Sequence, residues 1–299
     1  MLNFLPAPII ITFSLFFYFI NTLFWLVPIL IFSFLKAFFP VIFWQKIMSI
    51  LLDTMASNWV AVNTFIQKLF IKITFKVSGL EKLTMKNWYL VVANHQSWVD
   101  IVVLQRILHG KIPFLKFFLK KELIYVPFLG LAWWALDFPF MKRFSRAFLA
   151  KNPHLKGKDI ETTRKACAKF KHKPVSVMNF LEGTRFTTNK HQEQQSSFQY
   201  LLKPKAGGVA FVLDAMREHL TTIVDVTIYY PQGIPTFVDF LTGKVQQVEV
   251  EIKTFPLDNS FIGDYFNDQQ FKIDFQKRIN QLWCDKDKQL INMAINKEK

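Results

Sequence analysis

Residues 1–35 contain no charged side chain, and cysteines and acidic residues are scarce in the 299-residue chain. The two cysteines, Cys167 and Cys284, lie far apart without metal-site spacing, so both are expected to be reduced thiols. Only 22 Asp and Glu stand against 37 Lys and Arg, which gives a net charge of +15. Such a basic chain predicts an anionic partner: nucleic acid, phospholipid headgroups or a phosphorylated substrate. The concentrated hydrophobicity favours lipid, because nucleic-acid binding would explain only the charge.

The uncharged run at residues 5–35 is the candidate membrane anchor. As a helix it would extend roughly 46 Å, which exceeds the hydrocarbon core of about 30 Å. A cleavable signal peptide needs a basic n-region and a short apolar h-region; both are missing, so the run is expected to be retained. Two geometries stay open: a single span that ends or kinks at Pro28, or a hairpin in one leaflet that includes residues 37–44. Lys36 and Lys46 follow the run, and the positive-inside tendency places the remaining chain in the cytoplasm, at the inner membrane.

A second apolar stretch at residues 123–136 is shorter and is bounded by Glu122 and Asp137. It also contains Pro127 and Gly130, which disfavour a long helix. This stretch is expected to be core, or interfacial surface beside a bound lipid, and not a second span.

From about residue 70, strand-like and helix-like segments alternate. Strands are expected at 70–79, 88–93, 175–181 and 222–230, and helices at 159–173, 205–218 and 264–290. Residues 187–205 begin with a polar stretch and are expected to form a mobile loop. The alternation predicts an α/β fold with a mostly buried mixed sheet flanked by helices, preceded by an anchoring helix or hairpin. The expected parts are a membrane anchor (1–57), a main domain (58–258), and a C-terminal helix with a polar tail (259–299).

The sequence "NHQSWVD", residues 94–100, directly follows the strand expected at 88–93. His95 is the strongest general-base candidate, because imidazole titrates near neutral pH and the Asp100 carboxylate could orient its ring. The same spacing recurs at His154 and Asp159, but that pair follows no predicted strand. Ligands of α/β sheets bind at the carboxyl ends of strands, so only the first pair is a candidate site. Spacing alone still leaves open a structural His in a turn.

Ser97 lies two residues after His95 and invites a Ser-His-Asp interpretation. Residues i and i+2 seldom place a nucleophile on its own base, and no G-x-S-x-G elbow is present. Ser97 is therefore expected to make a local hydrogen bond or to cap a helix, with Asn94 as another accessory residue. A third metal ligand is missing nearby, so no metal is predicted.

The sequence "EGTR", residues 182–185, follows the strand expected at 175–181 and contains groups that suit phosphate. Gly183 allows close backbone approach, and Arg185 can bind phosphate through two hydrogen bonds. A strand-end turn with a surface ion pair is the alternative. Further cations are candidate accessory groups: Lys142, Arg143, Lys203 and Lys205. Each of them could instead be solvated charge.

Four sequence blocks together resemble those of the glycerolipid acyltransferases: "NHQSWVD", "FPFMKR", "FLEGTR" and "TIYYP". The chain is similar to the 1-acylglycerol-3-phosphate acyltransferase family over about residues 75–235. "FPFMKR" and "YLLKPKAGG" resemble most its lysocardiolipin-type and bacterial YihG-like branch. The resemblance implies a membrane enzyme that moves a fatty acyl group from acyl-CoA or acyl carrier protein to a lysophospholipid hydroxyl. The expected acceptor is 1-acylglycerol-3-phosphate and the product phosphatidate, with no cofactor, metal or covalent acyl-enzyme.

The resemblance also implies roles for individual residues. His95 would deprotonate the acceptor hydroxyl, and Asp100 would orient His95. The acceptor's phosphate would be bound by Arg143, Glu182, Gly183 and Arg185. Residues 58–258 would be the acyltransferase catalytic domain.

Two departures from the family pattern concern specificity. Leu181 stands where the third block usually has Pro, and "TIYYP" matches loosely a block that is usually Val-Pro-rich. Neither removes a chemical group, but both change the apolar walls that would select acceptor and acyl chain. Two alternatives stay open: the same chemistry on another lysophospholipid, such as a lysocardiolipin-like acceptor, and a non-catalytic lipid-binding membrane protein. A hydrolase is disfavoured because no credible nucleophile is present.

Overall fold

A computed structural model of the chain contains a six-stranded sheet in the spatial order β1-β8-β7-β2-β6-β3. Its strands are β1 (Thr74–Ser78), β2 (Tyr89–Ala93), β3 (Leu115–Phe117), β6 (Ser176–Phe180), β7 (Thr222–Tyr229) and β8 (Gln247–Pro256). The pair β7–β8 is antiparallel and the other neighbours are parallel, so the predicted mixed sheet is confirmed. A two-stranded ladder joins β4 (Leu119–Lys120) to β5 (Phe140–Met141). The structure describes residues 2, 4–141, 167, 170, 173–258 and 260–297.

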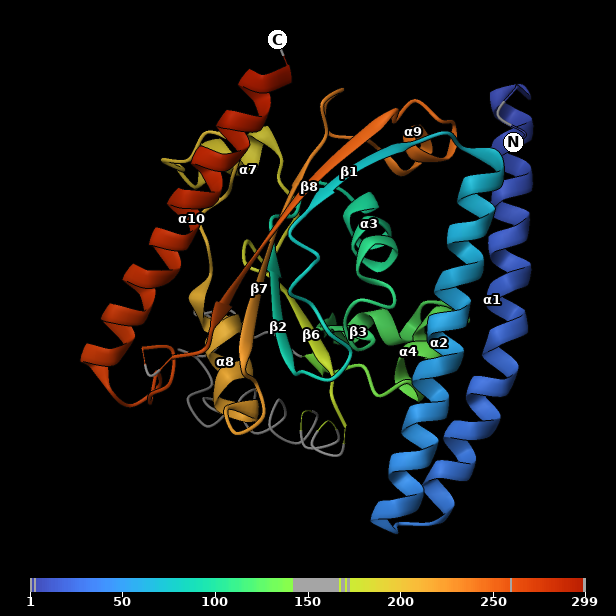
Figure 1. The fold of residues 1–299 in the computed structure, drawn as a ribbon, viewed down its shortest axis with the longest axis horizontal. Helices are drawn as coiled ribbons and strands as arrows, with labels where there is room; N and C mark the ends of the chain where they lie inside the picture. The colour runs from blue at the N-terminus through green and yellow to red at the C-terminus, as the bar shows by residue number, and fades with distance from the viewer. Residues whose placement is uncertain are drawn as a thin grey trace.

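Helices flank both faces of the sheet, as the sequence predicts. They are α1 (Ala7–Phe38), α2 (Ile42–Phe70), α3 (Val99–Leu108), η1 (Lys121–Tyr125), α4 (Leu129–Ala135), α7 (Thr188–Glu193), α8 (Ala206–Met216), α9 (Phe237–Leu241) and α10 (Gln269–Lys297). Figure 1 shows α8 and α10 on one side of the sheet, and α3 with the pair α1 and α2 on the other. Buried apolar side chains form two clusters, one on each face.

Most predicted elements are confirmed. The strands expected at 88–93, 175–181 and 222–230 are β2, β6 and β7, and the helices expected at 205–218 and 264–290 are α8 and α10. The strand expected at 70–79 is shorter, since α2 continues to Phe70 and β1 begins at Thr74.

The prediction of a mobile loop at 187–205 is wrong in part, because residues 188–193 form α7. Its N-cap Thr187 accepts a hydrogen bond from the backbone N–H of Lys190, which satisfies one free donor of the first turn. The helix expected at 159–173 lies mostly outside the described residues.

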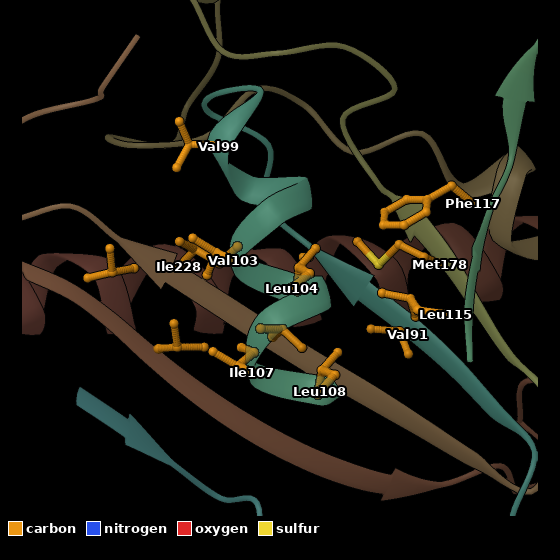
Figure 2. Close-up of a cluster of buried hydrophobic side chains, with 14 of the residues drawn as sticks. Val91, Val99, Val103, Leu104, Ile107, Leu108, Leu115, Phe117, Met178 and Ile228 are labelled. Carbon is orange, nitrogen blue, oxygen red and sulfur yellow. The ribbon is translucent and has the colours of Figure 1, made fainter. Parts of the chain in front are cut away.

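The helix α3 packs one apolar face onto the sheet and so holds the loop before it. Its buried apolar residues recur at helical spacing on one side: Val99, Val103, Leu104, Ile107 and Leu108. Figure 2 shows Val103, Leu104, Ile107 and Leu108 facing strand residues of the same cluster, which include Val91, Met178 and Ile228. Because β2 and α3 are both fixed in this core, the loop 94–98 between them is held at the carboxyl edge of the sheet.

The long helices α1 and α2 pack side by side as an antiparallel hairpin (Figure 1). Inside it, the Asn21 amide donates to Oδ1 of Asn63 at 2.8 Å. Among the described residues, only α1 is long and apolar enough to cross a membrane, and large side chains along it, such as Phe24 and Phe34, are exposed. The boundary expected at residues 57 and 58 falls inside α2, and the division into anchor and main domain stays a prediction.

The apolar stretch at 123–136 forms the end of η1 and all of α4, beside α1. Ala132 and Ala135 are buried, whereas Tyr125 and Trp134 are exposed. The stretch therefore contributes to both core and surface, and no second candidate span is found in the part of the chain that the structure describes.

Candidate active site

The carboxyl ends of β2, β6 and β7 meet at one edge of the sheet, because these strands are parallel neighbours. His95 follows β2, Glu182 follows β6, and Tyr230 follows β7. His95 and Glu182 are hydrogen-bonded although 87 residues separate them in the sequence. The fold thus joins the first, third and fourth sequence blocks in one site.

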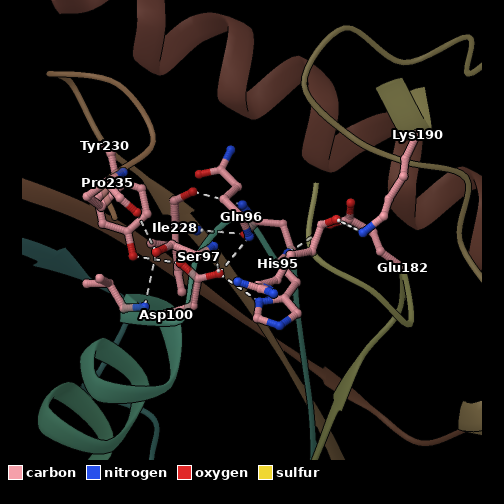
Figure 3. A network of polar contacts seen from close by, with 12 residues as sticks. His95, Gln96, Ser97, Asp100, Glu182, Lys190, Ile228, Tyr230 and Pro235 are labelled. Atoms are coloured by element: carbon pink, nitrogen blue, oxygen red, sulfur yellow. Dashed lines mark hydrogen bonds and ion pairs between the residues drawn. The ribbon is translucent and has the colours of Figure 1, made fainter. Parts of the chain in front are cut away.

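His95 and Asp100 form the centre of this site (Figure 3). The ring Nδ1 of His95 lies 2.9 Å from Oδ2 of Asp100. The Asp100 side chain is 1% exposed and that of His95 is 12% exposed, so the ring can still be reached. The His95 ring also stacks on Phe180, with 3.8 Å between centroids. An ionised Asp100 favours the tautomer with the proton on Nδ1, which leaves Nε2 as an acceptor.

Three further donors hold the Asp100 carboxylate. The backbone N–H groups of Gln96 and Ser97 donate to Oδ2 at 2.6 and 2.8 Å, and the Tyr230 hydroxyl donates to Oδ1 at 2.6 Å (Figure 3). Donors to an ionised oxygen are what allow a buried carboxylate to keep its charge. Burial, followed by the nearby Asp100, raises the pKa of Tyr230 well above its ordinary value, so its hydroxyl remains a donor.

No sequence pattern identifies Tyr230 as a separate site residue. Its only sequence signal is membership of the "TIYYP" block, where Tyr229 has the same chemistry. The bond to Asp100 spans 130 residues and depends on the alignment of β7 beside β2.

The Ser97 side chain makes one local hydrogen bond, in agreement with the expectation, and one to a segment that is distant in sequence. Its hydroxyl donates to the Pro235 carbonyl at 2.6 Å and accepts from the N–H of Val99 at 3.2 Å. The Asn94 amide both donates to and accepts from the backbone of Ile228, at 2.9 Å each. Both side chains therefore fasten the loop to neighbouring segments. Among the described residues, no group of three or more His, Cys, Asp or Glu could hold a metal ion.

Glu182 is fully buried, and its carboxylate binds backbone. Oε1 accepts from the N–H of His95 at 2.8 Å, and Oε2 accepts from the N–H of Leu202 at 3.0 Å. Burial raises the pKa of Glu182 to about 8, although the two N–H groups oppose this shift. Because both of its oxygens already accept backbone hydrogen bonds, this arrangement favours a role in holding the His95 backbone over the predicted contact with a phosphate.

His95 faces a cavity of about 570 Å³. Most of its wall is apolar and includes Trp98, Phe117, Leu129, Trp133 and Phe138. The α1–α2 hairpin adds polar side chains to the same wall, among them Tyr18, Asn63 and Gln67. A cavity of this size and composition suits a ligand with a long apolar part.

Among the described residues, two cations and one glycine line this cavity together with His95. The Arg185 guanidinium lies 4.7 Å from the ring centroid of Trp98, and Gly183 has a positive φ of 67°. Lys120 also lines the cavity, although no sequence pattern distinguishes it from Lys121.

The other predicted cations are not brought to the cavity by the described part of the chain. Lys203 and Lys205 are exposed, and neither is among the described residues that line it. Lys142 and Arg143, and the second pair His154 and Asp159, lie outside the described residues.

Comparison with known proteins identifies relatives. The Acyltransferase family matches residues 74–231. Human 1-acyl-sn-glycerol-3-phosphate acyltransferase gamma is 24% identical over 58% of this chain and 47% of its own length. Mouse lysocardiolipin acyltransferase 1 is 25% identical over 65% of this chain and 50% of its own. The 1-acyl-sn-glycerol-3-phosphate acyltransferase of Saccharomyces cerevisiae is 34% identical over 45% and 40%.

A solved structure is also similar, the 1-acyl-sn-glycerophosphate (LPA) acyltransferase PlsC from Thermotoga maritima. It aligns with a TM-score of 0.48 and 18% identity, over 90% of this chain and 94% of that one. The chain spans half or less of the length of the curated relatives named above. The family match nevertheless covers more than half of the chain. The chain therefore belongs to the acyltransferase family, which includes the 1-acyl-sn-glycerol-3-phosphate acyltransferases.

Proposed function

We propose that this protein is a membrane-bound O-acyltransferase that moves a fatty acyl group from acyl-CoA or acyl carrier protein to a lysophospholipid hydroxyl. The proposed acceptor is 1-acylglycerol-3-phosphate and the product phosphatidate. One observation carries the proposal: the His95–Asp100 pair faces a largely apolar cavity that also contains Arg185. The pair suits proton removal, and the cavity suits a lipid that carries an anionic group.

In the proposed reaction, Nε2 of His95 accepts the proton of the acceptor hydroxyl. The hydroxyl oxygen attacks the thioester carbonyl carbon, a C–O bond forms, and the C–S bond breaks. The proton on Nε2 then passes to the departing thiolate, so His95 returns to its neutral form. Asp100, held by Tyr230 and two backbone N–H groups, stabilises the charged imidazole between the two transfers. Such base catalysis contributes about 10²–10⁴-fold.

The acceptor phosphate is assigned to the cations of the cavity wall. Arg185 can bind it through two hydrogen bonds, Gly183 allows close approach, and Lys120 adds a positive charge. Lys142 and Arg143 remain proposed ligands on the basis of the second sequence block. For Glu182 we propose positioning of the His95 backbone, because its oxygens already accept backbone hydrogen bonds.

A second acceptor class has an observation in its favour. The relative named lysocardiolipin acyltransferase 1 matches 65% of this chain, a larger share than the gamma or yeast relative. A lysocardiolipin-like acceptor carries the same hydroxyl and phosphate chemistry, so the same residues would act on it.

The proposed location is the inner membrane, with residues after the anchor in the cytoplasm. The apolar helix α1 supports attachment, and Lys36 and the net charge of +15 support this orientation.

The test uses membranes that carry the full-length protein, labelled acyl-CoA or acyl-acyl carrier protein, and a panel of lysophospholipids. We expect transfer to 1-acylglycerol-3-phosphate that falls by about 10²–10⁴-fold in His95→Ala. The exposed His109 gives the matched control His109→Ala, which is expected to retain activity. Unchanged transfer in His95→Ala would refute the general-base assignment, whereas no transfer to any acceptor would favour a lipid-binding protein.

A further inference from the structure

The C-terminal helix α10 lies beyond the family match at 74–231, yet it is anchored in the interior of the domain. The ammonium of Lys286, fully buried, lies 2.6 Å from Oδ1 of Asp225 on β7. It also donates to the Val226 carbonyl at 2.8 Å and to the Thr227 hydroxyl at 2.9 Å. A buried cation with three partners on one strand holds α10 in one register against the sheet.

From this position α10 binds the segment 199–202, which crosses between the helix and the site. The Asp287 carboxylate accepts from the backbone N–H groups of Gln199 and Tyr200, at 2.7 and 2.8 Å. The indole N–H of Trp283, whose side chain is fully buried, donates to the Leu202 carbonyl at 2.9 Å. The segment is therefore held at both of its ends by one turn of α10.

The same segment reaches the backbone of His95 in two hydrogen bonds. The N–H of Leu202 donates to Oε2 of Glu182 at 3.0 Å, and Oε1 of Glu182 accepts from the N–H of His95 at 2.8 Å. Leu202 thus binds Trp283 through its carbonyl and Glu182 through its amide. The chain of contacts runs from α10 through Leu202 and Glu182 to His95.

We infer that α10 is a positioning element for His95, and that Asp287 and Trp283 are positioning residues for the proposed acyl transfer. Asp100 sets the direction of the His95 ring, whereas α10 sets the place of the peptide from which the ring extends. Catalytic groups have to be held within a fraction of an ångström, and misplacement by about 1 Å can cost about 10²-fold in rate. The inference rests on the proposed role of His95 as general base.

Two conservative variants of the full-length membrane protein test it, Asp287→Asn and Trp283→Phe. Asp287→Asn leaves one acceptor oxygen and turns an amide group toward a backbone N–H. Trp283→Phe keeps most of the aromatic volume but removes the N–H donor to the Leu202 carbonyl. We expect kcat to fall by about 5–20-fold in Asp287→Asn and by about 2–5-fold in Trp283→Phe, with KM for the acceptor within about twofold. Asp285→Asn, at a carboxylate that is 57% exposed on the same helix, is the matched control and should match the parent protein.

A merely structural role is separated by the double variant Asp287→Asn/Glu182→Gln. If both residues act through one chain of contacts, its kcat should fall no further than that of the more impaired single variant. The inference would be overturned if the fold-losses in kcat of the two single variants multiply in the double variant. It would also be overturned if the kcat losses of the single variants are explained by the fraction of unfolded protein, measured by thermal unfolding in parallel. So would a wild-type kcat in Asp287→Asn. Unchanged transfer in His95→Ala would instead refute the general-base role of His95, and no transfer by the parent protein to any acceptor would refute the proposed function, so these failures are distinguishable.

Discussion

The polar groups around His95 form two sets that differ in what they bind. On the buried side, Asp100, Tyr230 and Glu182 bind one another or the backbone at 2.6–3.0 Å. On the cavity side, Arg185 and Lys120 line an apolar cavity of about 570 Å³. Polar groups that the protein satisfies itself can hold a catalytic side chain, whereas cations that face a cavity can bind a ligand. Substitutions on the buried side should therefore lower kcat, whereas substitutions on the cavity side should raise KM.

The largest effect is expected on the buried side, from Asp100→Asn. The variant cannot stabilise a protonated imidazole, and its amide places a donor beside the N–H groups of Gln96 and Ser97. We expect kcat to fall by about 10²–10⁴-fold in the acyl-transfer assay. Thermal unfolding should be recorded in parallel, and a folded variant with at least half of the parent activity would contradict the role of Asp100.

The next largest effect is expected on the cavity side, from Arg185→Ala. A hydrogen bond to a charged group contributes about 1.5–3 kcal/mol, so KM for a phosphate-bearing acceptor should rise roughly 10- to 100-fold. The KM of the acyl donor should change much less. The control is Arg217→Ala, at an exposed arginine after α8. A loss confined to kcat would show that Arg185 does not bind the acceptor's ground state.

A smaller effect is expected from Tyr230→Phe, which removes one of the donors to Asp100 and keeps the ring. We expect kcat to fall by about 3–10-fold, since the other donors remain. The less neutralised carboxylate stabilises protonated His95, so the acidic limb of the pH–rate profile should move to higher pH. Tyr125→Phe, at a tyrosine that is 81% exposed, serves as control. An unmoved acidic limb would mean that the Tyr230 hydroxyl has no influence on the pair.

The smallest effect concerns stability and comes from Glu182→Gln. Burial raises the pKa of Glu182 in the folded protein to about 8, from an ordinary value of 4.5. Between these two values the unfolded chain has released that proton, so this group's contribution to stability falls as pH rises from about 4.5 to about 8. The amide introduced by Glu182→Gln does not titrate, so the variant lacks this contribution to the pH dependence of stability.

Denaturant unfolding of the solubilised protein at pH 5, 6.5 and 8 measures the difference between Glu182→Gln and the parent. The variant should gain relative to the parent as pH rises, and the gain should level off above pH 8. Lys173, another buried group with a shifted pKa, has no electrostatic interaction with Glu182 and cancels in the difference. A difference that is independent of pH would show that Glu182 is ionised throughout.

The predictable part of the site is the part that is local in sequence. His95 and Asp100 lie in one loop between a buried strand and a helix, and Gly183 and Arg185 directly follow the next predicted strand. Strand ends of a parallel sheet converge, so a pattern of strands and polar ends was sufficient to bring these residues together. The local hydrogen bond between Ser97 and Val99 was also predictable, because a serine two residues from His95 has poor geometry for a nucleophile and lies just before a helix.

The rest of the site depends on contacts between distant segments. Tyr230 reaches Asp100 across 130 residues, and Asp287 reaches Gln199 across 88. Lys120 and Lys121 are equivalent in sequence, and only packing decides that Lys120 lines the cavity. Glu182 resembles a substrate ligand in its sequence block, yet complete burial turns both of its oxygens toward backbone N–H groups.

Composition and hydrophobic periodicity by themselves determined the apolar first helix, the net charge of +15, the mixed α/β class and the strand ends that carry polar residues. These properties follow from side chains a few residues apart, whose effects are additive along the chain. Tertiary structure alone decided which hydroxyl supports Asp100, which carboxylate holds the His95 backbone, and which helix supports them. These contacts depend on burial and on partners that meet only when the sheet is assembled. A buried polar group without a hydrogen-bond partner destabilises the fold, so the carboxylates of Asp100 and Glu182 are each paired with specific donors.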